Sequence, residues 1–395
     1  MSNSVTKDNV SAEFEDLKRD LDKGSVLEVA AEYQKRLDEM HTLPLNIAVT
    51  GDAGAGKSSL VNAIRGVNDN DKEAAKVGEV ETTMEPKEYP HPKFPNMKIW
   101  DLPGIGTPEF KAAEYLKQVN FETYDVFIIV ISDRFTENAA FLAKEIERTT
   151  KKFYFIRSKI DLSIKGEKRK RNFSKEKILE TIRNYCEDCI RDAGVSPQKI
   201  FLISSWKVKE YDFPHLQKTI ADELPEHQKD VLTRAMHIFS ENELLSKKEV
   251  MKSYIKKAAF ISYVCGAVPI PGLSMACDVG ILVKALSDFC RVFGLDDQSL
   301  RFLARQTGKK YEELRSAIKK TPLVNAINRD LVFSLLTKSS LWTGISLIEN
   351  YFYFIPVIGS VFGGVSSFIV TYIFLNSFLD DAVEDAQNVL AKILK

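Results

Sequence analysis

The sequence has no excess of charge of either sign and few cysteines. Its 395 residues include 55 Lys and Arg against 55 Asp and Glu, so nothing global attracts nucleic acid and we expect no nucleic-acid partner. The five cysteines are irregularly spaced, which favours a reducing compartment over a disulfide framework. A polar, charged N-terminus predicts no secretory signal, and Ser2 excludes N-myristoylation, which requires glycine there. We therefore expect a cytoplasmic protein.

The sequence also lacks the spacing of a metal-binding motif. Its five histidines show no ligand pattern. Cys186 and Cys189 form a C-x-x-C, but they lie in a helical stretch with no second pair and no nearby histidine. We interpret this pair as structural, with a zinc site as the alternative.

A phosphate-binding loop is the most informative feature present. Residues 51–58 read Gly-Asp-Ala-Gly-Ala-Gly-Lys-Ser and follow the apolar run 45–49, which matches G-x-x-x-x-G-K-[ST] between a strand and a helix. Glycines let the backbone fold around an anion, and the following helix adds its positive end. Lys57 is expected to reach the outer phosphates, and the Ser58 hydroxyl to ligate Mg²⁺. The nucleotide-binding residues predicted here are Gly51, Asp52, Ala53, Gly54, Ala55, Gly56, Lys57, Ser58 and Ser59.

A second motif, Asp-Leu-Pro-Gly at residues 101–104, follows the predicted strand 97–101. Asp101 there can hold Mg²⁺ through a water, and the amide of Gly104 can sense the γ-phosphate. Between the two motifs lies the stretch 67–85, which we expect to be mobile. We expect Thr83, in preference to Thr82, to complete the Mg²⁺ shell when the γ-phosphate is present.

Two further loops predict which base is bound. Ser158-Lys159-Ile160-Asp161 follows the strand 152–157, and Asp161 can accept hydrogen bonds from N1–H and the exocyclic amine of guanine, which adenine does not offer. The stem of Lys159 can lie over the base plane. Serine replaces the asparagine of the usual Asn-Lys-x-Asp pattern, but it can still bridge to the phosphate loop. Ser205 and Trp206, after the strand 199–203, can present a backbone amide to the guanine carbonyl. We predict GTP and GDP as ligands, with Mg²⁺.

One residue is missing from the expected machinery. Ile105 follows Gly104, where Ras-like enzymes place the glutamine that orients the attacking water. We therefore hypothesise slow hydrolysis by the monomer and acceleration on self-association.

The order of elements predicts two domains. Strands at 45–50, 97–101, 125–131, 152–157 and 199–203 alternate with helices near 57–66, 111–120, 137–148, 175–192 and 214–223. This alternation predicts an α/β domain over 44–224 with a doubly wound, mainly parallel sheet, and residues 86–91 add an antiparallel edge strand. Residues 225–395 predict an all-α domain, onto which two helices within 1–43 pack.

Two long uncharged stretches, 258–277 and 351–379, raise the question of a membrane. Prolines and glycines interrupt both. We consider burial inside a helical bundle and membrane insertion or docking as alternatives. Five lysines would suit anionic headgroups or form a solvated helix face: Lys247, Lys248, Lys252, Lys256 and Lys257. We interpret the basic run 165–171 as an exposed loop of the nucleotide domain, with a nuclear signal or a lipid patch as the alternatives.

The motifs together resemble those of the immunity-related (interferon-inducible) GTPases. The likeness extends to the stretches Tyr89–Lys93, Ile99–Gly106, Phe153–Asp161, Tyr211–Pro214 and Phe293–Asp297. In this respect the chain resembles the effector branch of the family, because Lys57 stands where the regulatory branch carries methionine.

This resemblance implies a Ras-like nucleotide domain and a dynamin-like GTPase. Such a protein dimerises through its nucleotide face, hydrolyses GTP cooperatively and associates peripherally with intracellular membranes around pathogen vacuoles. It also implies that Glu81 acts across the dimer on the ribose, so the predicted catalytic set is Lys57, Glu81, Thr83 and Gly104, with Ser58, Thr83 and Asp101 at the metal. Two alternatives remain: a nucleotide-gated binding module with negligible hydrolysis, and an integral-membrane GTPase anchored by 351–379.

Overall fold

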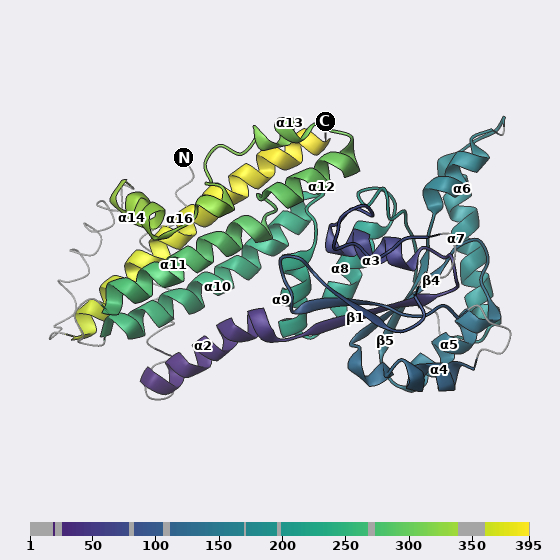
Figure 1. Ribbon diagram of the computed structural model, residues 1–395, viewed down its shortest axis with the longest axis horizontal. Coiled ribbons are helices and arrows are strands. Elements are labelled where there is room, and N and C mark those ends of the chain that lie inside the picture. The colour runs from purple at the N-terminus through teal and green to yellow at the C-terminus, as the bar shows by residue number, and fades with distance from the viewer. Residues whose placement is uncertain are drawn as a thin grey trace. The chain divides into compact units, whose positions relative to one another are not determined.

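Six strands form one sheet in the order β2-β3-β1-β4-β5-β6. The computed structural model describes residues 19, 26–78, 83–105, 111–169, 171–195, 199–267, 273–338 and 360–394 (Figure 1). The strands are β1 (Leu45–Gly51), β2 (Lys87–Pro90), β3 (Met97–Asp101), β4 (Val126–Ile131), β5 (Lys152–Arg157) and β6 (Ile200–Leu202). All neighbours pair parallel except β2, which is antiparallel to β3 at one edge. The predicted α/β class with a mainly parallel sheet is confirmed.

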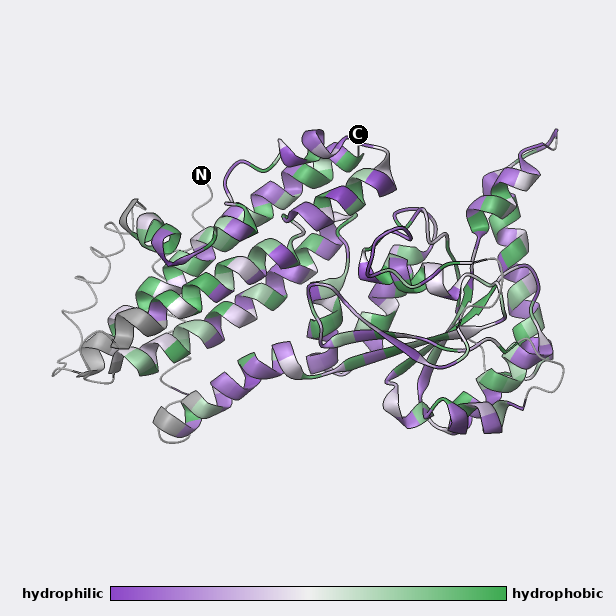
Figure 2. Ribbon diagram, viewed as in Figure 1, coloured by the Kyte–Doolittle hydropathy of each residue, from purple (hydrophilic) through white to green (hydrophobic). Residues whose placement is uncertain are grey.

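Helices cover both faces of this sheet (Figure 1). They are α3 (Lys57–Arg65), α4 (Ala112–Gln118), α5 (Glu137–Arg148), α6 (Ile160–Glu167), α7 (Lys175–Asp192), α8 (Phe213–Glu223) and α9 (Glu226–Ala235), with a 3₁₀ turn η1 at Phe121–Thr123. Helices α4 to α7 enclose the core around Phe127, Ile129 and Phe155. Helices α3, α8 and α9 pack against strands on the opposite face. The strands are mostly hydrophobic, as a sheet covered on both sides requires (Figure 2).

The compact unit that contains the sheet runs from Leu43 to Met236 and also takes in Phe302–Gly308. Within it, Gln306 accepts a hydrogen bond from the backbone N–H of Val208 at 3.2 Å. Every strand lies within one residue of its predicted range. Helix α6, which begins inside the Ser-Lys-Ile-Asp motif, was not predicted. Its eight residues are too few to show a clear hydrophobic period.

The second unit is helical, as predicted, and combines N- and C-terminal segments. Its described elements are α2 (Val26–Thr42), α10 (Glu241–Ala267), α11 (Leu273–Val292), α13 (Tyr311–Arg315), η2 (Val324–Ala326), α14 (Arg329–Lys338) and α16 (Ser360–Leu394), and α12 (Asp297–Thr307) starts in it. Tyr33 of α2 stacks on Phe260 of α10 with ring centroids 4.5 Å apart. The first of the two helices predicted within 11–40 lies outside the described residues.

Helices α10, α11 and α16 run side by side and form the core of this unit (Figure 1). A Cβ on Gly364 would lie 2.7 Å from the backbone oxygen of Tyr263, so glycine is needed where α16 approaches α10. Phe368, Leu375 and Leu379 are buried in this core, as are Ala258 and Phe260. Where burial is described, at residues 258–266 and 364–379, the two uncharged stretches are therefore mostly bundle interior. Within the described ranges, no helix is both long enough and apolar enough to cross a bilayer.

The structure differs from the expected exposure of the lysines on α10. Lys247 is 2% exposed and donates to the carbonyl of Val292 at 2.7 Å, so it caps α11 instead of facing headgroups or solvent. Lys248 pairs with Asp380 at 3.0 Å. The uncharged residues surrounding these lysines gave no period that could separate a buried face from an exposed one.

The cysteines also differ from expectation. Cys265 is disulfide-bonded, which the irregular cysteine spacing did not predict.

Candidate nucleotide-binding site

The loop after β1 has the geometry that a phosphate-binding loop requires. Gly51 has a φ of 133°, and a Cβ there would lie 2.0 Å from the backbone oxygen of Val130, so no other residue fits. Gly54 and Gly56 also have positive φ, and Gly56 precedes the first residue of α3. The start of α3 thus directs its unpaired N–H groups toward the loop, where an anion is favoured.

Lys57 is buried within this loop, with 7% of its surface exposed. Its Nζ donates to the carbonyls of Gly51 at 3.2 Å and Asp52 at 3.0 Å. The ammonium group is therefore held at the loop by neutral acceptors, which a phosphate oxygen would replace with stronger, charge-assisted bonds.

The three predicted metal ligands lie together. The Ser58 hydroxyl donates to Oδ2 of Asp101 at 2.6 Å, and the Thr83 hydroxyl donates to the same oxygen at 3.0 Å. Asp101 is 1% exposed, and burial raises its pKa, although Ser58 and Lys57 act in the opposite direction. A buried carboxylate that receives two hydroxyls is a set of oxygen ligands suited to a hard cation.

Oδ1 of Asp101 provides a test of whether these residues fit Mg²⁺. This oxygen is buried and has no hydrogen-bond partner. An unpartnered buried carboxylate oxygen carries a desolvation cost, which a cation or its bound water would relieve. The residues therefore fit the ion. No group of three or more His, Cys, Asp or Glu side chains suited to a metal occurs in the described part of the chain, so this site depends on hydroxyls.

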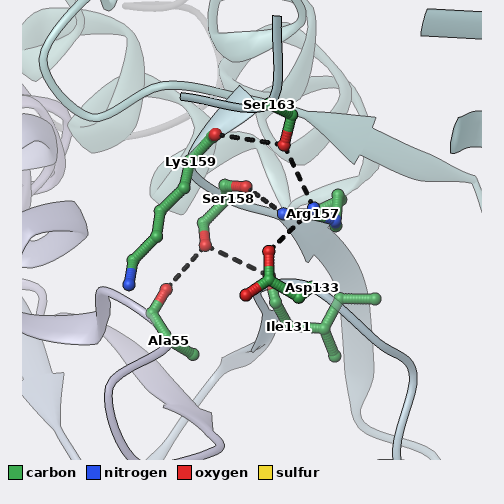
Figure 3. A network of polar contacts seen from close by, with 7 residues as sticks. All are labelled: Ala55, Ile131, Asp133, Arg157, Ser158, Lys159 and Ser163. Atoms are coloured by element: carbon green, nitrogen blue, oxygen red, sulfur yellow. Dashed lines mark hydrogen bonds and ion pairs between the residues drawn. The ribbon is translucent and has the colours of Figure 1, made fainter. Parts of the chain in front are cut away.

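Ser158 connects the loop that carries the Ser-Lys-Ile-Asp motif (residues 158–161, the base loop) to the phosphate-binding loop (residues 51–58, the phosphate loop). Its hydroxyl donates to the carbonyl of Ala55 at 2.6 Å and lies 3.1 Å from the carbonyl of Ile131 at the end of β4 (Figure 3). Serine thus provides the bridge that the sequence predicted in place of asparagine. Lys159 is exposed and has a left-handed φ of 56°, and its Cε lies 3.9 Å from the position of a Cβ on Gly56. Its stem therefore runs alongside the phosphate loop.

Asp161 lies in the first turn of α6 and is partly buried. Its charge raises the pKa of Tyr211, although burial is the larger cause of that shift. Across the described residues its carboxylate forms no protein hydrogen bond, so it is available to a ligand.

Trp206 was expected to present its backbone N–H to the base, and in the structure this N–H donates to the Ser204 hydroxyl at 3.3 Å. It is 58% exposed, and its indole N–H donates to Asp69 at 3.2 Å. Ser205 lies next to it in a turn closed by the Lys207 N–H and the Ser204 carbonyl.

The stretch 67–85 is more firmly held at its start than expected. The buried side chain of Asn62 bonds both backbone groups of Ala75, at 2.7 and 3.0 Å, and also reaches Asp69. Arg65 donates to the carbonyls of Glu73 and Pro90. Glu81 and Thr82 lie outside the described residues, so Glu81 stays a prediction.

Ile105 is fully buried, and its N–H donates to the carbonyl of Gly51 at 3.2 Å. Gly104 precedes it and is partly buried. The isoleucine side chain therefore packs in the hydrophobic core of the domain.

The C-x-x-C pair shows no sign of a metal site. Burial raises the pKa of Cys186 to about 11, so its thiol stays protonated near neutral pH, and both Cys186 and Cys189 are free. A protonated, buried thiol is a poor zinc ligand.

Sequence reasoning missed three residues at this site. Thr136 caps α5 and donates to Asp52 of the phosphate loop at 3.2 Å. Asn138 donates to the carbonyl of Ile105. Arg157, at the end of β5, holds the base loop. A charged residue that ends a buried strand directly before a motif was a usable signal for Arg157.

Comparisons with known proteins agree with this geometry. The family model of the interferon-inducible GTPases (IIGP) matches residues 11–393. Interferon-inducible GTPase 5 of Rattus norvegicus is 40% identical over 386 residues, which cover 97% of this chain and 83% of that protein. Interferon-gamma-inducible GTPase 10 of Mus musculus is 37% identical over 94% of this chain and 87% of its own length. Interferon-inducible GTPase 1 of Mus musculus is 32% identical over 94% and 88%.

The family resemblance is thereby confirmed. A phosphate loop, a buried carboxylate with two hydroxyls and a free aspartate on the base side are found in a chain that matches this family over nearly its whole length. The chain belongs to the interferon-inducible GTPase family and is a GTP-hydrolysing enzyme.

Proposed function

We propose that this GTPase binds GTP with Mg²⁺, assembles through its nucleotide face in the GTP state and hydrolyses GTP faster in that assembly. The observation that carries the proposal is the convergence of Ser58 and Thr83 on Asp101 next to the buried Lys57. These groups come from three separate segments. Their convergence has a clear use at the β- and γ-phosphates of a nucleotide.

The residues act by position and charge. Lys57 exchanges the carbonyls of Gly51 and Asp52 for phosphate oxygens and stabilises the negative charge that develops there. Ser58 and Thr83 would hold Mg²⁺, together with Asp101, to which both hydroxyls now donate. The ion, when bound, neutralises charge between the outer phosphates. The Gly104 amide contacts the γ-phosphate.

Base recognition rests on Asp161. Its free carboxylate accepts two hydrogen bonds from guanine, and Lys159 covers the base plane. Adenine would leave the carboxylate unpaired, so GTP is preferred over ATP. The amides of Ser205 and Trp206 serve the guanine carbonyl.

Self-association is supported by what surrounds the site. The buried Ile105 cannot orient the attacking water, so another group must do so. Met84, next to Thr83, is 75% exposed, Val77 is 44% exposed and Trp206 is 58% exposed. Large exposed apolar side chains beside a nucleotide site favour a protein interface there. By the family resemblance, Glu81 acts across this interface.

Titration with GTP, GDP and ATP in the presence of Mg²⁺ tests the proposal. We expect GTP and GDP to bind and ATP to bind at least about 100-fold more weakly. The Lys57→Ala variant should lose affinity for every nucleotide. Equal binding of ATP and GTP would overturn the base assignment, and unchanged affinity in Lys57→Ala would overturn the loop assignment.

The proposed setting is cell-autonomous immunity at an intracellular membrane. The exposed basic residues Lys165, Lys168, Arg169 and Arg171 at the end of α6 support contact with anionic lipid. This end of α6 is hydrophilic (Figure 2). Co-sedimentation with phosphatidylserine vesicles should fall when Lys168, Arg169 and Arg171 are replaced by Glu, and binding that survives this change would contradict the lipid contact.

A further inference from the structure

Arg157 is a buried cation that the proposed function does not yet use. It is the last residue of β5, directly precedes the Ser-Lys-Ile-Asp motif and is 5% exposed. Its guanidinium donates to the carbonyl of Ser158, to the hydroxyl of Ser163 at 3.2 Å and to the carboxylate of Asp133 at 3.4 Å (Figure 3). One side chain thus fastens the motif, the first turn of α6 and the loop after β4.

The backbone that Arg157 fastens needs external support. Lys159 adopts a left-handed φ of 56°, which is unfavourable for a residue with a Cβ. The Ser163 hydroxyl, which receives a hydrogen bond from Arg157, also lies 3.5 Å from the carbonyl of Lys159, and the N–H of Ile160 donates to the carbonyl of Ile203. Arg157 and Ser163 therefore hold the turn that begins α6, and Asp161 lies in the first turn of that helix.

These contacts continue into the phosphate loop. The hydroxyl of Ser158, whose carbonyl accepts from Arg157, donates to the carbonyl of Ala55. The phosphate loop connects in turn to the loop after β4 through Asp52 and Thr136, which caps α5. Arg157 also pairs with Asp133 in that loop, but Asp133 is 87% exposed. A shift of Arg157 would thus move Ser158 and, through it, the base side relative to the phosphate side.

We propose that Arg157 is a positioning residue for guanine recognition: it fixes the turn at residues 158–163 so that the Asp161 carboxylate meets both N1–H and the 2-amino group of the base. Arg157 itself does not touch the nucleotide. The proposal rests on the role proposed above for Asp161.

Arginine is suited to this role in a way that lysine is not. A planar guanidinium presents several donors in a fixed fork and can bond a carbonyl, a hydroxyl and a carboxylate together, whereas an ammonium group is a compact charge on a flexible stem. Asp133 is 87% exposed, so its pairing adds little. The holding contacts are those to Ser158 and Ser163.

The test compares GDP with IDP, which lacks the 2-amino group, by calorimetry on the full chain with Mg²⁺. Wild-type protein should prefer GDP by about 10-fold or more, since IDP forfeits a charge-assisted hydrogen bond. Arg157→Lys should lower the affinity for GDP and bring the ratio of GDP affinity to IDP affinity toward about 1, because Asp161 no longer bonds the 2-amino group of guanine. Ser163→Ala should lower the ratio in the same direction, and Asp133→Ala should leave it within about twofold of wild type.

Arg183→Lys is the matched control. Arg183 donates to the carbonyl of Ile200 and to Asp212 at 2.6 Å in the same domain, and neither acceptor belongs to residues 158–163. This variant should have a lower melting temperature than wild type but the same ratio of GDP affinity to IDP affinity. A folded Arg157→Lys protein with an unchanged ratio would overturn the proposal.

Asp161→Ala separates this proposal from the proposed function. If it removes the preference for GDP while Arg157→Lys does not, only the positioning role fails. If Asp161→Ala retains the preference, Asp161 does not read the base and both fail.

Discussion

At the scale of single residues, Asp101 shows how a binding site costs stability. Burial raises the pKa of this carboxyl from its ordinary 3.8, and Oδ1 lacks a partner. A buried charge without full compensation destabilises the folded chain, and such costs persist where a ligand later uses the group.

Asp101→Asn should therefore stabilise the nucleotide-free protein at neutral pH. Because the folded-state pKa is raised, the folded chain binds more protons than the unfolded one above pH 3.8, so stability falls as pH rises through the raised pKa. Urea unfolding should show Asp101→Asn gaining about 1 kcal/mol over wild type at pH 7.5 and less at pH 4.5. A loss of stability at pH 7.5 would contradict the account, as would undiminished Mg²⁺-dependent GTP affinity.

Gly51→Ala should be the most damaging change in the phosphate loop. Its Cβ would lie 2.0 Å from the oxygen of Val130, and its φ of 133° is strained for alanine. We expect a loss of about 3 kcal/mol or more in the free energy of unfolding. Gly54→Ala, with nothing within 4 Å of its Cβ, is the control and should cost only about 1 kcal/mol. Equal losses would show that the close approach to β4 is not responsible.

At the scale of elements, single buried side chains fasten loops to helices. Asp385 of α16 is fully buried and accepts the N–H groups of Lys319, Lys320 and Thr321 at 2.7–2.9 Å, together with the Thr321 hydroxyl. Three successive amides around one carboxylate form an anion-binding turn.

Asp385→Ala should cost about 4 kcal/mol, because it leaves three N–H groups without an acceptor. Asp381→Ala, which removes only an exposed pair with Lys320 at 3.3 Å, should cost less than about 1 kcal/mol. Chemical denaturation of the two variants measures the difference. Similar costs would mean that surface charge, and not the turn, accounts for the effect of Asp385.

Asn62→Ala should loosen the segment that leads to Thr83. Asn62 bonds both backbone groups of Ala75, so its removal exposes them to exchange. Hydrogen exchange in residues 69–76 should accelerate by about 10-fold or more, while β4 in the same sample stays protected. Unchanged exchange in 69–76 would show that Arg65 alone holds the segment.

The sequence predicted those elements that depend on local pattern. Strands came within one residue because apolar runs bounded by turn residues mark them closely. Ser58 and Asp101 were expected to meet because their motifs predict ligands of one Mg²⁺ ion, and they do meet, since β1 and β3 are neighbouring parallel strands. Arg157 was missed because its partners Ser163 and Asp133 come from segments that only the fold brings together.

At the scale of the whole molecule, the sequence pattern predicted less than it did for single elements. Phe302–Gly308 belongs to the compact unit of the sheet, although its residues up to Thr307 form the second half of α12, which begins in the other unit. No feature of the sequence marks that division. Lys247 was expected at a lipid-facing or solvated helix face, yet it is buried and donates to a carbonyl at the end of α11.

The exposed side chains around the site lead to a prediction for the assembled protein. If the proposed assembly supplies the group that orients the attacking water, which Ile105 cannot do, turnover of GTP per chain should rise with protein concentration. Met84→Asp and Trp206→Asp should flatten this rise by placing charge in the interface, while Phe141→Asp, an exposed position on α5, should not. Turnover per chain that is independent of concentration in wild type would contradict assembly.

The central claim is that Asp161 reads a guanine base held beside the phosphate loop, and exchanging its donors and acceptors tests this most directly. Calorimetry of wild type should show binding of GDP and not of XDP, whose 2-carbonyl repels a carboxylate. Asp161→Asn presents an amide donor to that carbonyl and should reverse the preference. If Asp161→Asn binds GDP as wild type does and still rejects XDP, the account is contradicted.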